Sequence, residues 1–169
     1  MEKEKIYLVG QISMINESTY LWRKDIREFF KSDTQLINNF DVIDPCLNEW
    51  LIGVNKEINK DGDDLKRGKI YKQRGMNLLV PKDYNYVLRS TGCIANLNQY
   101  DPLKPIVGSI FELAWYYQHP EKFVVGVFDG DWKDNILCNH PFVRETVDVW
   151  CRGHMEAAEL IKNFYMGTN

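Results

Sequence analysis

One carboxylate lies in an otherwise apolar helical stretch, GSIFELAWYYQHP, which runs from Gly108 to Pro120. Two interpretations of this residue, Glu112, are open. With Ser109 three residues earlier, the Ser-x-x-Glu spacing is typical of a capping box, in which the two side chains bond to the backbone at a helix start. Alternatively, a carboxylate one turn into a helix is favoured in its ionised form, and Gly108 lets a ligand come close to the backbone. Such a group could attack an anomeric carbon and hold a glycosyl-enzyme intermediate.

The elements that would position Glu112 begin with a short apolar run, KIYLVG, which predicts a buried strand over residues 5–10. Apolar residues on one helical face predict a helix from Thr19 to Phe30. FDVIDP, from Phe40 to Pro45, predicts a second strand that ends at the proline. Because this order is strand, helix, strand, we expect a right-handed crossover and a parallel sheet.

The second half of the chain continues the alternation. We expect a helix from about Lys82 to Ser90, a strand from Cys93 to Leu97, a helix over 108–118 and a strand over 123–128. Apolar residues then recur every three or four positions from Val143 to Phe164, which predicts one long closing helix. The pattern indicates a single domain over 1–169 with an α/β fold. The architecture we expect is a flavodoxin/Rossmann-like three-layer sandwich with a mostly parallel sheet. The charged, weakly periodic segment at about 46–81 is predicted to be an irregular insertion.

In that architecture a small ligand binds beyond the carboxyl ends of the strands. The loops after the strands that end near Val9, Leu97 and Phe128 should meet at this edge. They would bring together the candidates for sugar or phosphate contacts, which are Gly10, Gln11, Ser13, Asn98, Asp101 and the helix start at Gly108 and Ser109.

Three segments, taken in order, resemble the signature segments of the nucleoside 2-deoxyribosyltransferase-like family, which includes deoxynucleoside 5′-monophosphate N-glycosidases. KIYLVGQIS is similar to the opening strand of the family with its Tyr-x-x-Gly pattern, here Tyr7 and Gly10. PKDYNYVLRSTGCIANL is similar to its Asp-led helix, which runs into an apolar strand. VGSIFELAW is similar to its Gly-x-x-x-Glu-Leu helix start. The resemblance covers most of residues 5–128 and leaves 46–81 unmatched.

The resemblance implies a role for each matching residue. Glu112 falls where the family has its nucleophile, and Asp83 where it has the acidic partner that helps to protonate the leaving base. Tyr7 falls where an aromatic hydroxyl contacts the nucleophile. The family also completes its pocket with a polar residue of a neighbouring subunit, for which Asn135 and Asn139 are the candidates. Without the resemblance, Asp83 could be a helix N-cap and Tyr7 a core aromatic.

This sequence departs from the family at one position that bears on the substrate. Some transferase members carry a carboxylate six residues before the nucleophile, which binds the sugar hydroxyls, and Ile106 stands there in this chain. Asp101 could take its place from a longer loop, or it could only begin the Asp101-Pro102 turn.

Composition excludes several classes of protein. A net charge of −3 with scattered basic residues argues against binding to a nucleic acid polymer. The four cysteines form no Cys-x-x-Cys pair and the three histidines show no ligand spacing, so we expect free thiols in a reducing cytoplasm and no metal. The charged start MEKEK has no signal-peptide core, and no apolar stretch approaches ~20 residues, so we expect no membrane span. The aromatic run Trp115-Tyr116-Tyr117 would suit a homodimer or a higher homo-oligomer.

These residues predict an enzyme that cleaves the N-glycosidic bond of 2′-deoxyribonucleosides through a covalent deoxyribosyl intermediate on Glu112 and transfers the sugar to another nucleobase. The chemistry requires no cofactor. The alternatives are a 2′-deoxynucleoside 5′-monophosphate N-hydrolase, a non-catalytic nucleotide-binding module on the same fold, and a structural protein in which a capping box explains Glu112.

Overall fold

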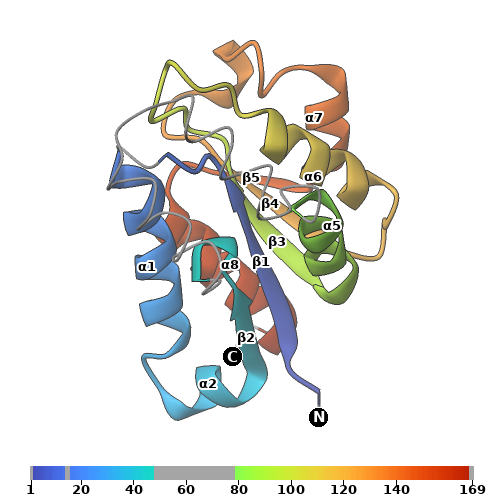
Figure 1. Ribbon diagram of the computed structural model, residues 1–169. Helices are drawn as coiled ribbons and strands as arrows, with labels where there is room; N and C mark the ends of the chain where they lie inside the picture. Colours follow the sequence, from blue (N-terminus) through green and yellow to red (C-terminus); the bar gives the residue numbers. More distant parts are fainter. Residues whose placement is uncertain (1, 14–15, 48–78, 168–169) are drawn as a thin grey trace.

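The computed structural model describes residues 2–13, 16–47 and 79–167, so the predicted insertion at about 46–81 lies almost wholly outside the described residues. Five parallel strands form one sheet in the order β2-β1-β3-β4-β5 (Figure 1). The bounds of the strands are Glu4–Gly10 for β1, Phe40–Ile43 for β2, Gly92–Asn96 for β3, Phe123–Val127 for β4 and Val149–Cys151 for β5. Every residue of β3 is buried, as expected for the central part of a parallel sheet that is covered on both faces.

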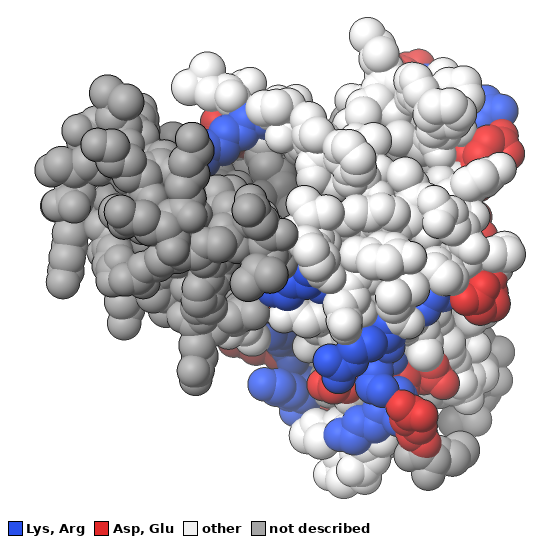
Figure 2. Space-filling model, turned by 45° about the vertical axis from the view of Figure 1, so that its right-hand side comes forward, with Lys and Arg blue, Asp and Glu red and all other residues white. Residues whose placement is uncertain are grey.

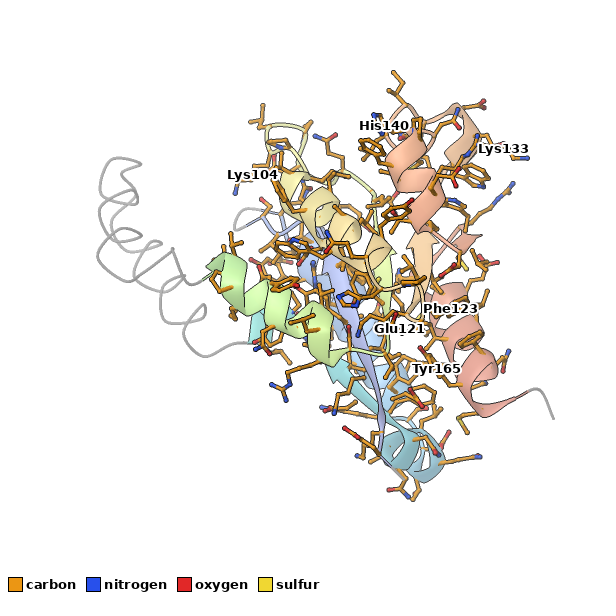
Figure 3. The ribbon with its side chains drawn as sticks, turned by 90° about the vertical axis from the view of Figure 1, so that its right-hand side faces the viewer. Lys104, Glu121, Phe123, Lys133, His140 and Tyr165 are labelled. Atoms are coloured by element: carbon orange, nitrogen blue, oxygen red, sulfur yellow. The ribbon has the colours of Figure 1, made fainter. Side chains whose placement is uncertain are left out.

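Helices cover both faces of the sheet and make the three layers predicted from the sequence. One layer holds α1 (Ser18–Phe30) and α8 (His154–Met166), and the short α2 (Thr34–Asn39) precedes β2. The other layer holds α5 (Leu79–Arg89), α6 (Val107–Tyr117) and α7 (Pro141–Thr146), as the side view in Figure 3 shows. The 3₁₀ turns η1 (Pro45–Leu47) and η3 (Trp132–Asp134) lie in connections that the structure describes. Among the described residues no helix has the length and apolar character needed to cross a bilayer.

The side chains of β1 alternate between the two layers. Ile6 and Leu8 pack into the core beneath α1 and α8, whereas Tyr7 and Val9 pack into the core beneath α5 and α6. This alternation follows from the period of two residues along a strand. It directs Tyr7 toward the layer that contains Glu112.

The prediction of one long closing helix over residues 143–164 is wrong. The chain instead forms α7, then the three-residue strand β5, then α8. Val147 ends α7 in an extended conformation, and Gly153, also extended, is the N-cap of α8. The apolar spacing continued across this break because Trp150 lies on a strand too short to show alternation of its own. β5 pairs with β4 and gives the sheet a fifth strand.

Replacing Gly92 by alanine is expected to destabilise the fold by about 1–3 kcal/mol, because β3 has no room for a side chain there. A Cβ atom at Gly92 would lie 2.6 Å from the Phe123 carbonyl oxygen and 2.9 Å from the Tyr165 hydroxyl. Urea unfolding measures the change. Gly153→Ala is the matched control, because an added Cβ there meets nothing within 4 Å. Equal stability of the two variants would contradict the close packing around β3.

Candidate active site

A cavity of about 420 Å³ lies at the carboxyl end of β1. Its walls come from the β1–α1 connection, η1, the first turns of α5, and the segment that enters α6. This is the edge where ligands bind in open α/β sheets, and β1 and β3 flank the point where the strand order reverses. The predicted site residues that line it are Gly10, Gln11, Asp83, Gly108, Ser109 and Glu112.

Glu112 lies on α6 with only 8% of its surface exposed, and its carboxylate accepts a short hydrogen bond from the hydroxyl of Tyr7. Tyr7 is fully buried on β1, and burial together with the negative charge of Glu112 raises its pKa well above the ordinary value. The hydroxyl therefore keeps its proton and remains the donor. The contact that the resemblance implies between Tyr7 and the acidic residue is present in the structure.

Burial also controls the protonation of Glu112. Removal from water disfavours the ionised form and raises the pKa of this carboxyl to about 8. The Tyr7 hydrogen bond opposes this rise in the pKa, the negative charge of Asp83 adds to it, and the positive charges of Arg23 and Lys82 oppose it. The Glu112 carboxyl can therefore change its protonation state near neutral pH.

The capping-box interpretation of Glu112 is wrong. α6 begins at Val107, its N-cap residue is Ile106, and no side chain caps this end. Ser109 is therefore inside the first turn of the helix rather than before it, and it is buried against the cavity. Gly108 lines the cavity beside it, and a Cβ atom added there would meet no atom within 4 Å.

Asp83 lies inside α5, four residues after its start at Leu79, so it is not an N-cap. Burial raises the pKa of its carboxyl, and the Lys82 ammonium, with Nζ 3.4 Å from Asp83 Oδ1, opposes that rise. Asp83 and Glu112 line the same cavity and raise the energy of each other's charge. Two residues 29 positions apart in the sequence thus form a coupled carboxyl pair.

Gln11, Ser13 and Asp101, which the sequence suggested as substrate contacts, bond to one another. The Gln11 amide donates to the carbonyl oxygens of Asp101 (2.9 Å) and Lys104 (2.6 Å), and its oxygen accepts from the Asp101 amide (2.7 Å). The Ser13 hydroxyl donates to Asp101 Oδ2 (2.7 Å), and Asp101 Oδ1 accepts from the Leu103 amide (3.1 Å). These bonds join the β1–α1 connection to the loop before α6. Ser13 and Asp101 are not among the residues that line the cavity.

The remaining predicted contacts lie elsewhere. Asn98 bonds to Asn96 (2.9 Å) and to Asp129 (3.0 Å), which joins the loops after β3 and β4 outside the cavity. Asn139 is exposed on the segment before α7 and does not line the cavity. The role predicted for Asn139 is to complete the pocket of a neighbouring subunit, and it stays a prediction.

Gly10 lines the cavity and cannot carry a side chain. A Cβ atom there would lie 2.9 Å from the Trp22 ring and 3.0 Å from the Asn96 carbonyl oxygen. Its own carbonyl oxygen accepts from the guanidinium of Arg23 (2.8 Å). Glycine therefore lets α1 and β3 close around the end of β1.

Sequence reasoning missed two cations of the site. Arg23 is fully buried, and its guanidinium donates to the carbonyl oxygens of Gly10, Gln11 (3.2 Å) and Thr19. Lys82 lines the cavity beside Asp83. Arg23 could have been suspected from its place between Trp22 and Ile26 on the buried face of α1. For Lys82 the only signal was its position next to Asp83 in the sequence.

No protein-family model and no curated protein matches this chain in sequence. The interpretation of the site therefore rests on its geometry and on the residue patterns described above. Within the described parts of the chain, no three His, Cys, Asp or Glu side chains come together as they would to hold a metal ion.

Replacing Glu112 by glutamine is expected to raise the free energy of unfolding at pH 8 by on the order of 2 kcal/mol. The folded-state pKa of about 8 lies above the ordinary value of 4.5, so the folded chain holds a proton that the unfolded chain has lost between these values. Wild-type stability must then fall as the pH rises through that window. Glutamine does not titrate and removes this loss.

Urea unfolding at pH 5 and pH 8 measures the effect, which should be much smaller at pH 5. Glu121→Gln is the matched control, since the Glu121 side chain is 67% exposed in the turn after α6 (Figure 3). A stability gain at Glu112 that is the same at both pH values would contradict the raised pKa.

Proposed function

We propose that the protein cleaves the N-glycosidic bond of 2′-deoxyribonucleosides and transfers the deoxyribosyl group to another nucleobase. The observation that carries this proposal is a pair of carboxyls on one cavity, the buried Glu112 and the half-buried Asp83, with the Tyr7 hydroxyl bonded to Glu112. The resemblance of three segments to the nucleoside 2-deoxyribosyltransferase-like family supports the same chemistry.

In the first step the Glu112 carboxylate attacks C1′ of the sugar and forms a C–O bond. The C1′–N bond breaks, its electron pair passes to the base, and the proton of Asp83 moves to a base nitrogen. A covalent deoxyribosyl ester on Glu112 and a free base result. A deoxyribosyl centre has no electron-withdrawing 2′-hydroxyl, so it tolerates positive charge at C1′ better than a ribosyl centre.

In the second step a nitrogen of another base attacks C1′, the ester bond breaks, and Glu112 leaves as a carboxylate. The incoming base gives up its proton to Asp83, which restores the starting state. If water attacks instead, the product is free deoxyribose and the reaction is hydrolysis. The apolar side chains of Ile12 and Ile106 on the cavity walls favour transfer to the extent that they limit access of water to the ester.

The reaction needs one proton on the carboxyl pair: Asp83 protonated and Glu112 ionised. Burial raises both pKa values, and the negative charge of Asp83 adds to the rise at Glu112, so ionisation of one carboxyl disfavours ionisation of the other. Tyr7 stabilises the ionised form of Glu112 by its hydrogen bond and thereby favours the reactive arrangement.

Hydrolysis of deoxynucleoside 5′-monophosphates is the second candidate, and one observation favours it. Lys104 lines the cavity from the loop before α6 and is exposed, so its ammonium could reach a 5′-phosphate at the rim. Arg23 does not offer a phosphate site, because it does not line the cavity and its two terminal nitrogens bond to backbone carbonyl groups.

A homo-oligomer in the cytoplasm remains part of the proposal. α5 and α6 expose Leu88 (45%), Phe111 (59%) and Tyr117 (64%), and Figure 2 shows a broad face on this side with few charged side chains. Tyr116, which the sequence suggested as part of this surface, is instead buried, and its hydroxyl bonds to Ser90. A second copy that covers this apolar face could place a polar residue such as Asn139 near the cavity.

Incubation of the protein with deoxynucleosides and deoxynucleotides, with and without free bases, is expected to release or exchange the base. Glu112→Gln should lower kcat/KM by at least about 1000-fold because it removes the nucleophile, and Asp83→Asn should lower it strongly because it removes the acid. Chromatography of the bases makes the measurement, and Glu121→Gln should retain wild-type activity. A wild-type protein that releases no base from any member of the panel would overturn the proposal.

Tyr7→Phe is expected to move the acidic limb of the kcat/KM–pH profile to higher pH. The missing hydroxyl no longer lowers the pKa of Glu112, so its carboxyl ionises later, and a shift of one unit costs about tenfold in activity at pH 7. The activity should recover toward wild type at higher pH. Tyr117→Phe is the control, because Tyr117 lies on the exposed side of α6. A uniform loss at every pH would contradict the role given to Tyr7.

A further inference from the structure

Lys82 lines the cavity with an ammonium group that lacks hydrogen bonds among the described residues. Its Nζ atom is buried and makes no hydrogen bond to any described residue, although the side chain lines the cavity. The nearest charge is Asp83 Oδ1 at 3.4 Å, an ion pair without hydrogen-bond alignment, and that oxygen is also buried without a partner in the described chain. On its other side Nζ lies 5.5 Å from the centre of the Tyr86 ring.

A buried ammonium without hydrogen bonds is costly, because it has three donors and has lost water around them. Such a group in a native structure calls for an explanation. The ring of Tyr86 offers attraction but no oxygen acceptor. Lys82 and Asp83 therefore present to a ligand in the cavity two neighbouring polar atoms that make no hydrogen bond to any described residue.

Asp83, when protonated, donates one hydrogen bond, and Lys82 donates another next to it. The complementary ligand edge has two adjacent acceptors. Guanine and hypoxanthine carry that edge at N7 and the 6-oxo oxygen, whereas adenine carries N7 beside an amino group, which is a donor. Two donors would face each other if adenine entered in the same orientation.

We propose that Lys82 is a specificity-determining residue that donates to the 6-oxo oxygen of the leaving base, so that the site prefers 6-oxopurine deoxynucleosides to deoxyadenosine. This inference rests on the proposed function. Asp83 gives its proton to N7 while Lys82 holds O6, and the electron pair of the broken C1′–N9 bond is delocalised onto a ring with both positions bound. The amino group of adenine would leave the Lys82 ammonium desolvated and unpaired.

The sharpest comparison uses deoxyinosine and deoxyadenosine as donors, because the two differ only in the group at purine C6 and the hydrogen on the adjacent N1. The wild-type ratio of kcat/KM, deoxyinosine over deoxyadenosine, is expected to be at least about tenfold. Lys82→Met should bring it to within about threefold of unity, mainly by loss of activity on deoxyinosine. Lys82→Arg, which keeps a charged donor, should retain a preference for deoxyinosine.

Lys133→Met is the matched control. Lys133 also lies over an aromatic ring, with Nζ 5.8 Å from the centre of Trp132, but it is exposed on η3 and does not line the cavity (Figure 3). This variant should leave the ratio unchanged. Thermal unfolding checks that each variant folds. If Lys82→Met does not fold, the ratio is measured on Lys82→Ala instead.

The outcomes separate the two levels of the proposal. A wild-type protein inert toward all deoxynucleosides would overturn the proposed function and this inference with it. Base release without a preference for deoxyinosine would overturn the inference alone. So would a Lys82→Met variant that loses activity equally on both donors, since Lys82 would then act only through its charge.

Discussion

The hydrogen bond from Tyr7 to Glu112 is the contact on which the rest of the site depends. It joins β1 to α6, the helix that follows β3, and it offers the buried carboxylate a partner in place of water. Burial raises the pKa of this carboxyl to about 8, and without the Tyr7 hydrogen bond the pKa would be higher still. Because Tyr7 keeps its proton, the bond favours the charged form of Glu112 while β1 and α6 hold both groups in place.

A second network keeps the end of β1 in a fixed position. The Arg23 guanidinium donates hydrogen bonds to three backbone carbonyl groups, and the Gln11 amide bonds to the loop before α6. Asp44, at the end of β2, is buried beside both Arg23 and Arg27. Since Arg23 and Gln11 bond mainly to backbone groups, they hold the wall of the cavity in place. In the proposed reaction the chemistry falls to the carboxyl pair and Lys82.

The strands β1 to β4 and the helices α1, α5 and α6 could be predicted, because each is long enough for its apolar period to show. β5 could not, since three residues carry no alternation and the surrounding spacing imitated a helix. Ser-x-x-Glu spacing could not distinguish a capping box from a buried carboxylate, because the decision depends on where α6 begins. Likewise, the sequence predicted that Ser13 and Asp101 lie at the carboxyl edge of the sheet, but it could not show that they bond to each other.

Charge balance connects these features. With Glu112 ionised, Asp83 protonated and Lys82 charged, the three cavity groups carry no net charge, and the cation lies beside the acid rather than beside the nucleophile. Loss of the Asp83 proton to a base would create a new negative charge, which the Lys82 ammonium at 3.4 Å is placed to stabilise. When Glu112 forms an ester it loses its negative charge, so it no longer repels the negative charge that appears on Asp83 in the same step. In the proposed reaction a proton and a carboxylate charge therefore change together.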